Sequence, residues 1–266
     1  MYLDRAKLIL NNEYKEKYAL GHLDYQKDFM NEKIKHSYQV LGAGNVILKH
    51  EKCFAELNEN MHSYYQAIVL LHDVARFTEI LEREKNNFID HGVVGALMLQ
   101  QKEFFIDNAD GLAIKHHGHL IEELYADDLY KSLSEEKKEQ VRKLAFLVRD
   151  ADKIANYYLL VSNFEQIKRL FFVPDRYKNP FCKVPSEKVL ADFLACKSIN
   201  KADMESFADF TLMLLAWIFD LNYKYSFAML KKWEILERFI PYLQSFWNEG
   251  DDKVYYSILK KFIDRH

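Results

Sequence analysis

The feature that most constrains this chain is the absence of proline from its first 173 residues. Only 4 prolines and 8 glycines occur among its 266 residues, and the first proline is Pro174. Because proline breaks helices and glycine weakens them, a long stretch with so few of both is typical of helical structure. Hydrophobic residues make up 49% of the chain, enough for one large domain or for a core domain with an appended one. The sequence therefore predicts an all-α protein.

The expected helices divide into two sets. Residues 1–31, 32–50 and 61–77 carry helical patterns, and further helices are expected to begin at His91, near Asn108 or Asp110, and after Ser134. Three of the four prolines lie in residues 173–185, which indicates a loop or linker. Apolar stretches at residues 186–197, 203–220, 223–247 and 252–264 predict the later helices. We expect a core domain over residues 1–165 and a helical extension over residues 166–266 that packs on it.

Charge and cysteine content argue against several classes of protein. The net charge of -3 gives no general attraction to nucleic acid or to anionic membranes. The three cysteines are far apart and odd in number, which indicates a reducing compartment and no disulfide framework. Neither a leading signal segment nor an apolar run long enough to span a bilayer is evident. We expect a cytoplasmic protein without a membrane or a nucleic acid duplex as partner.

A solid apolar run ends in two ionisable residues. Residues 67–71 read Ala-Ile-Val-Leu-Leu, which predicts a buried helical segment, and His72-Asp73 follows immediately. Ionisable groups at the end of a buried segment are costly unless they are paired or bound to a metal. Nine of the 10 histidines precede residue 120. We therefore expect the partners of this pair, and the chemistry, in the first part of the chain.

Histidines and aspartates on other predicted helices can supply those partners. His36 shares a helical face with Val40 and Ile47, so it is expected to face the interior. Asp152 falls on or beside the buried stripe of the long helix that follows Ser134. The candidate metal ligands, in chain order, are His36, His72, Asp73, His91, His116, His117 and Asp152.

This ligand set indicates the kind of metal site. Imidazole and carboxylate suit divalent ions such as Fe, Mn, Zn, Ni or Co, and the lack of thiolate argues against a structural zinc site. Seven ligands exceed the needs of one ion, whereas two ions can share them if a carboxylate bridges, and Asp73 is the natural bridge. Two ions about 3.5–4 Å apart are a common solution for hydrolysis of phosphate esters.

The order of these residues resembles a known family. His36, His72-Asp73 and Asp152 are similar to the H…HD…D signature of the HD superfamily of metal-dependent phosphohydrolases, and the resemblance covers residues 30–160. The apolar run before His72-Asp73, the basic Arg76 after it, and the context Ala151-Asp152-Lys153 match as well. His91-Gly92 and His116-His117 resemble the added ligands of the dinuclear branch, which includes cyclic-dinucleotide phosphodiesterases and dinucleoside polyphosphate hydrolases. Gly118-His119-Leu120 stands where the cyclic-di-GMP enzymes have Gly-Tyr-Pro, which argues against that substrate.

The resemblance implies a five-helix bundle and a phosphohydrolase or phosphodiesterase. The expected substrate is a nucleotide or another small phosphorylated molecule, attacked by a metal-bound hydroxide, and a homodimer is compatible with this assignment. One ion would be held by His36, His72, Asp73 and Asp152. The second would be held by His91, His116 and His117, with Asp73 as the bridge. Asp73 and Arg76 are the expected catalytic residues, and Arg76 would steady the phosphoryl oxygens.

Several alternatives stay open at this point. The core can instead be a non-catalytic sensor or scaffold that binds a nucleotide or metal. Hydrolysis of ppGpp needs the same signature without His91 or the His116-His117 pair. His117 can orient a ligand rather than bind the metal. Glu32, one turn before His36, and Asp150 are more simply a surface acid and a solvated or orienting acid, and Lys115 and Lys153 are more simply surface charges than phosphate ligands.

Overall fold

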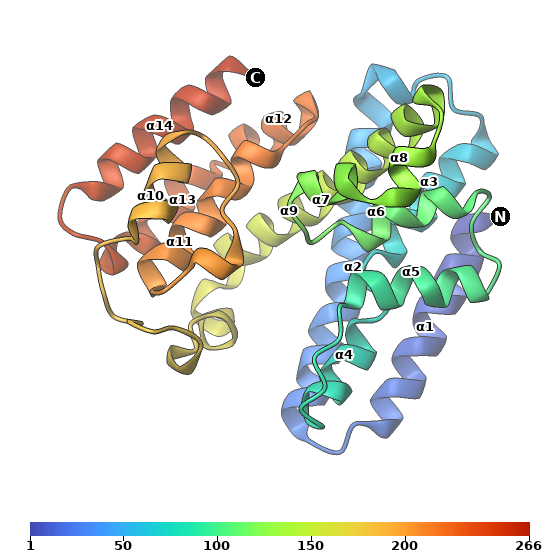
Figure 1. The fold of residues 1–266 in the computed structure, drawn as a ribbon, viewed down its shortest axis with the longest axis horizontal. Helices are drawn as coiled ribbons and strands as arrows, with labels where there is room; N and C mark the ends of the chain where they lie inside the picture. Colours follow the sequence, from blue (N-terminus) through green and yellow to red (C-terminus); the bar gives the residue numbers. More distant parts are fainter. The chain divides into compact units, whose positions relative to one another are not determined.

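The computed structural model describes residues 1–266, apart from the side chains of residues 166, 167 and 169–171. Helices are the regular elements of the described chain, which contains no strand, so the all-α prediction is confirmed (Figure 1). Its contacts define two units, Met1–Ala155 and Asn156–His266. The expected domain limits at residue 165, and the packing of the extension on the core, stay predictions. Among the described residues, no helix combines the length and the hydropathy needed to cross a membrane.

The first unit is built from helices α1 to α8 and the first half of a long helix, α9. Their bounds are α1 Tyr2–Leu20, α2 Asp24–His50, α3 Glu59–Leu71, α4 Arg76–Arg83, α5 His91–Gln101, α6 Gly111–Lys115, α7 Ile121–Ala126, α8 Asp128–Ser132 and α9 Glu135–Phe171, with 3-10 turns at Lys52–Phe54 and Asn108–Asp110. α1 and α2 both pack against α3, and α5 packs against α6. The start of α9 after Ser134, as predicted, is supported by a hydrogen bond from the Lys137 amide to the Ser134 hydroxyl at 3.3 Å.

The helical pattern expected over residues 1–31 is confirmed except for a break at Gly21, where the chain turns between two helices. The backbone of Gly21 is extended, with φ -67° and ψ 123°. The Gln26 side chain accepts hydrogen bonds from the amides of His22 and Leu23, each at 3.2 Å, and so caps the start of α2. As a consequence α2 begins at Asp24 and includes the helix predicted from residue 32.

The predicted helix over residues 61–77 is also interrupted, at the His-Asp pair. α3 ends at Leu71, and its apolar run from Ala67 to Leu71 is fully buried. The His72 ring donates through Nδ1 to the Val69 carbonyl at 2.9 Å, and this local bond competes with continuation of the helix. His72 and Asp73 therefore lie in a tight turn between α3 and α4. The backbone carbonyl of Asp73 accepts a hydrogen bond from the Arg76 amide at 2.9 Å.

A close approach between α5 and α6 positions the next histidines. The Asp90 carboxylate caps α5, as predicted, by accepting from the amides of Gly92 at 2.8 Å and Val93 at 3.1 Å. A Cβ on Gly92 would lie 2.5 Å from the Lys115 carbonyl oxygen, so only glycine allows the two backbones to come this close. The contact brings the first residue of α5, His91, beside the end of α6.

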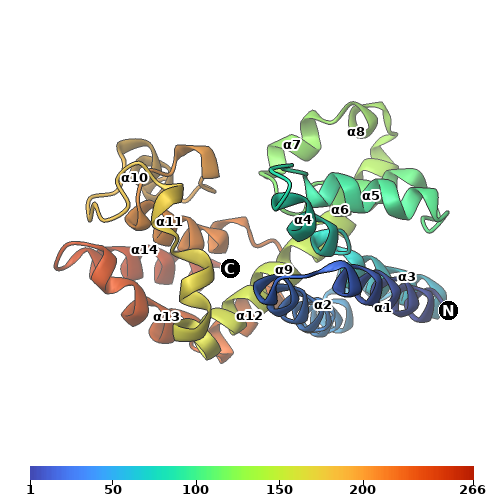
Figure 2. The same ribbon diagram turned by 90° about the horizontal axis from the view of Figure 1, so that it is seen from below.

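The second unit contains the end of α9 and five shorter helices. These are α10 Glu187–Leu194, α11 Phe207–Ala216, α12 Lys224–Lys232, α13 Ile235–Leu243 and α14 Asp251–Arg265, with 3-10 turns at Pro174–Arg176, Lys201–Asp203, Trp217–Asp220 and Gln244–Phe246. Both views show α10–α14 as one group (Figures 1 and 2). Every residue of α11 is buried. The proline-containing segment forms a loop, as predicted, whereas the predicted helix over residues 223–247 divides at Glu234, whose φ is 51°.

Candidate metal centre

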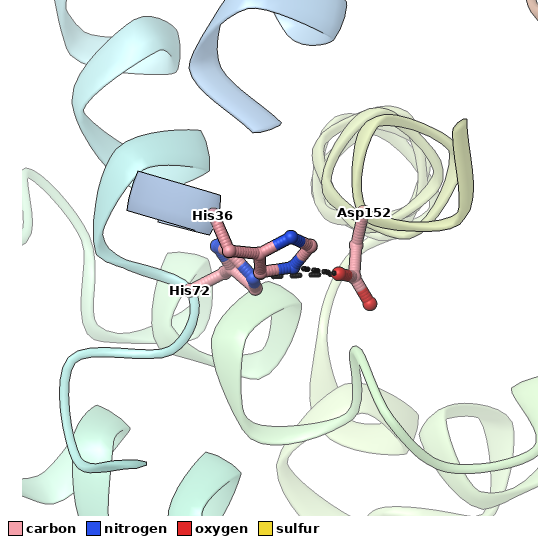
Figure 3. Close-up of side chains that lie close together, drawn as sticks. All are labelled: His36, His72 and Asp152. Carbon is pink, nitrogen blue, oxygen red and sulfur yellow. Dashed lines mark hydrogen bonds and ion pairs between the residues drawn. The ribbon is translucent and has the colours of Figure 1, made fainter. Parts of the chain in front are cut away.

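Three side chains from distant parts of the first unit point toward one another (Figure 3). His36 comes from the middle of α2, His72 from the turn after α3, and Asp152 from α9. His36 Nε2 lies 2.9 Å from Asp152 Oδ1, and His72 Nε2 lies 3.6 Å from the same oxygen. One ligand atom from each of the three lies within 4.8 Å of the other two. This spacing allows one ion to contact all three residues.

A second group of ligand atoms surrounds Oδ1 of Asp73, in the turn between α3 and α4. Asp73 Oδ1 is 3.2 Å from His117 Nε2 and 3.3 Å from His91 Nε2, and the two nitrogens are 3.2 Å apart. Ligand atoms about 2.0–2.1 Å from a tetrahedral ion are separated by about 3.3–3.4 Å. The triangle therefore has nearly the size that one ion requires. His72, Asp73 and His117 also lie within 4.8 Å of one another, so the two groups adjoin.

Two of the histidine rings, those of His72 and His117, are oriented by hydrogen bonds from their Nδ1 atoms. His72 Nδ1 donates to the Val69 carbonyl at 2.9 Å, and His117 Nδ1 donates to the Ile114 carbonyl at 2.7 Å. Each bond fixes the proton on Nδ1 and turns the Nε2 lone pair toward the centre. Among the described residues, the buried His72 Nε2 has no hydrogen-bond partner. A buried nitrogen with a free lone pair beside two carboxylates is what a metal ligand requires, so these residues fit a divalent ion.

Burial keeps most of the rings neutral. It lowers the pKa of His36 and of His117, and burial together with the nearby Arg76 lowers the pKa of His91 to about 4. Burial alone would lower the pKa of His72 too, but attraction to Asp73 and Asp152 outweighs it and raises that pKa. Neutral imidazole is the form that binds a metal.

The two carboxylates are held in their ionised form. Burial alone would raise the pKa of Asp73, but Lys33 and Arg76 outweigh it and hold that pKa well below its usual range. Asp152 behaves in the same way, with His36 and His72 lowering its pKa against the effect of burial. The centre therefore offers two anionic ligands, one in each group.

Two residues that sequence reasoning missed border the centre. Lys33 Nζ lies 3.0 Å from Asp73 Oδ2, while the expected Arg76 lies with Nε 3.2 Å from Asp73 Oδ1. Glu79 accepts from the Arg76 guanidinium at 2.7 Å and lies 3.5 Å from His91 Nδ1. Helical spacing carried a signal for both, because Lys33 is one turn before His36 and Glu79 is one turn after Arg76.

The structure does not bring His116 to this cluster. Its Nε2 donates to Asp127 Oδ2 at 2.9 Å, and its Nδ1 faces His119 Nδ1 at 3.2 Å. Adjacent residues in a turn point in different directions, so His117 faces the centre and His116 faces away. A role for His116 as ligand of the second ion has no support in this arrangement.

The remaining candidates lie as follows. Glu32 is on the surface, where it pairs with Lys35 at 2.8 Å. Asp150 and Lys153 are both buried, so the interpretation of Lys153 as a surface charge is wrong, and of the two interpretations of Asp150 the solvated acid is wrong while the orienting acid stays a prediction. Lys115 pairs with Asp127 at 2.6 Å rather than with any residue of the centre.

The fold and the site define a class: an all-α unit with a buried centre of imidazoles and carboxylates. The family model of the HD domain matches residues 34–157, a segment that includes the whole set from His36 to Asp152. The match supports the assignment of this segment to the HD-domain superfamily, whose members are generally hydrolases that bind divalent metals. Neither the curated proteins nor the solved structures compared with the chain gave a match.

Proposed function

We propose that this protein is a metal-dependent phosphohydrolase that acts on a small phosphorylated molecule, with nucleotides as the favoured class. The observation that carries the proposal is the convergence of four histidine Nε2 atoms on two ionised carboxylates, with a lysine and an arginine beside them. The HD domain match over residues 34–157 supports the same reaction class.

Two ions fit the ligand atoms better than one. His36, His72 and Asp152, with the second oxygen of Asp73 at 3.7 Å from His72 Nε2, would hold the first ion. His91, His117 and Asp73 Oδ1 would hold the second, and their near-tetrahedral spacing favours a dinuclear centre over the single ion that ppGpp hydrolysis needs. Bound Fe, Mn, Zn, Ni or Co ions would act as Lewis acids on a phosphoryl oxygen.

The two cations have the position and the access needed to bind phosphate. Both pair with Asp73, and both side chains are partly exposed, at 22% for Lys33 and 23% for Arg76. When the Asp73 oxygens serve as metal ligands, the ammonium and the guanidinium are free to turn to the substrate. Arg76 can then clamp two phosphoryl oxygens at once, and Lys33 contributes a point charge. Glu79, bonded to Arg76, keeps the guanidinium in place.

The substitution Asp73→Asn tests the proposal. Purified protein is stripped with a chelator and reloaded with Mn²⁺, and metal content is compared with turnover of a chromogenic phosphodiester and of a nucleotide panel. Because Asp73 touches both ligand groups, we expect the variant to lose bound metal and more than about 100-fold in turnover, beyond the usual effect of a residue that only orients a ligand. Asp28→Asn, an exposed acid on α2, is the matched control and should behave as wild type.

Two outcomes would contradict this assignment. Equal metal content and equal turnover in wild type and Asp73→Asn would reject the centre. Metal binding together with nucleotide-dependent thermal stabilisation, but without release of phosphate by the wild type, would favour a non-catalytic sensor instead.

A further inference from the structure

A second group of metal-ligating side chains lies outside the centre. His116, in the turn after α6, and His119 face each other with their Nδ1 atoms 3.2 Å apart. The Glu123 carboxylate, on α7, comes within 3.4 Å of His119 Nδ1. None of these three residues takes part in the ligand groups around Asp73 and Asp152. The cluster therefore needs an explanation of its own.

The outer nitrogens of both rings are hydrogen-bonded to carboxylates. His116 Nε2 donates to Asp127 Oδ2 at 2.9 Å, and His119 Nε2 donates to Asp90 Oδ2 at 2.7 Å. A carboxylate accepts, so each neutral ring carries its only proton on Nε2 and a lone pair on Nδ1. Two lone pairs that face each other at 3.2 Å repel unless a cation, or an additional proton, lies between them.

The backbone of the turn that carries His116 and His119 is held in place by hydrogen bonds that do not involve the two rings. The buried guanidinium of Arg149, on α9, donates to the carbonyl oxygens of His116 at 2.8 Å and His119 at 2.6 Å. The His119 side chain is 25% exposed and that of Glu123 is 55% exposed, so an ion from solvent can reach the space between them. The site is thus both preorganised and accessible.

We propose that His116 Nδ1, His119 Nδ1 and the Glu123 carboxylate bind one further divalent transition-metal ion. Two nitrogens about 2.0–2.1 Å from a tetrahedral ion lie about 3.3–3.4 Å apart, close to the observed 3.2 Å. Asp127 and Asp90 play the part of the carboxylates that orient metal-bound histidines. Two imidazoles with one carboxylate favour zinc, cobalt or nickel over magnesium or calcium.

Metal counting tests the proposal without any assay of activity. The full chain is stripped of metal and titrated with Co²⁺ in competition with a chromophoric chelator. We expect His119→Ala to bind one equivalent fewer than wild type, since it removes a ligand. The Asp90 bonds to the α5 amides remain, so the equivalents of the Asp73 centre remain as well. The matched control is His22→Ala, an exposed histidine, which should bind as much Co²⁺ as wild type.

Two further variants keep the test decisive if His119→Ala folds poorly. Glu123→Gln changes an exposed side chain, and Asp127→Asn keeps a capping oxygen for the Leu129 amide, so each variant retains the local helix caps. We expect the Asp127→Asn site to bind Co²⁺ 10–100-fold more weakly, the usual effect of losing an orienting carboxylate. Equal Co²⁺ counts and affinities in wild type and in all three variants would overturn the proposal and would mean that the two rings share a proton only.

Discussion

Two buried aspartates, Asp73 in the first unit and Asp209 in the second, have different surroundings. In the second unit Asp209, at the start of α11, is fully buried. Its carboxylate accepts from three backbone amides, those of Ser186 at 2.7 Å, Glu205 at 2.8 Å and Ser206 at 3.1 Å. Backbone amides belong to the fold and cannot be exchanged for a ligand. Asp209 is therefore an internal cap that ties α11 to the segment before α10.

Asp73, in the first unit, is 2% exposed, but within the described part of the chain the partners of its carboxylate are side chains. Lys33, Arg76, His91 and His117 all approach it within 3.3 Å. Such partners can be exchanged for a metal ion or released to a phosphate, because side chains rotate while the backbone stays in place. For these two aspartates the kind of partner, rather than burial itself, separates the carboxylate that holds the structure from the one that is available for chemistry.

The largest effect that can break this comparison is expected from Asp209→Ala. The substitution removes three charge-assisted hydrogen bonds and leaves buried amides without partners, so we expect a loss of about 3 kcal/mol in the free energy of unfolding. All three tryptophans, Trp217, Trp233 and Trp247, lie in the second unit, so their fluorescence in a urea titration reports on it. The exposed Asp175→Ala, in the same unit, is the control and should change little.

The comparison also predicts that Asp209→Ala leaves the metal content of the protein unchanged. Metal bound per folded chain should equal that of wild type, because the ligand groups found among the described residues lie in the first unit. A variant that kept its stability and lost its metal would show that the distinction between backbone and side-chain partners carries no information.

A smaller effect, on affinity, is expected from Glu79→Gln. Glu79 is buried beside the centre and touches Arg76 and His91 without belonging to either ligand group. Loss of its charge weakens the orientation of both, so we expect metal affinity to fall 10–100-fold. Glu82→Gln, on the same helix but bonded to Lys85 and Asn87, is the control. An unchanged affinity in Glu79→Gln would make Glu79 a purely structural acid, like Asp209.

Much of the centre could be predicted from the sequence, because the signature is local and ordered. The apolar run before His72 correctly predicted a buried helical segment, and the acidic residue before His91 correctly predicted the start of a helix. Helical periodicity correctly predicted that His36 faces the interior. Convergence of six of the seven candidates followed from the order of the motifs. Their roles as ligands stay predictions.

Other features could not be predicted, since they depend on directions that a turn sets. His116 and His117 are neighbours in sequence, and no pattern of spacing says which ring faces the centre. His119 acquires its partners, Asp90 and Glu123, only through the turn that Arg149 holds. Burial of Asp150 and Lys153 requires that α9 be covered on more than one face, which the stripe of apolar residues alone does not reveal.

The smallest expected effect concerns the backbone that sets one edge of the centre. In Gly92→Ala the new methyl group would meet the Lys115 carbonyl oxygen at 2.5 Å, and a backbone atom cannot move aside cheaply. α5 must shift, so we expect a loss of about 1–2 kcal/mol in stability and weaker metal binding at His91 and His117. Gly42→Ala, on α2, meets nothing within 4 Å and should instead stabilise by about 0.5–1 kcal/mol.

Chemical denaturation of the two glycine variants, followed by Co²⁺ titration, separates the effects. Since α5 carries one ligand of the second group and none of the first, Gly92→Ala should weaken one Co²⁺ equivalent and spare the one at His36, His72 and Asp152. Equal weakening of both would mean that the centre responds as a single rigid body, and that the Asp73 side chain transmits strain between its two oxygens. A Gly92→Ala protein as stable as Gly42→Ala, with unchanged binding, would show that the contact between α5 and α6 is not what positions His91.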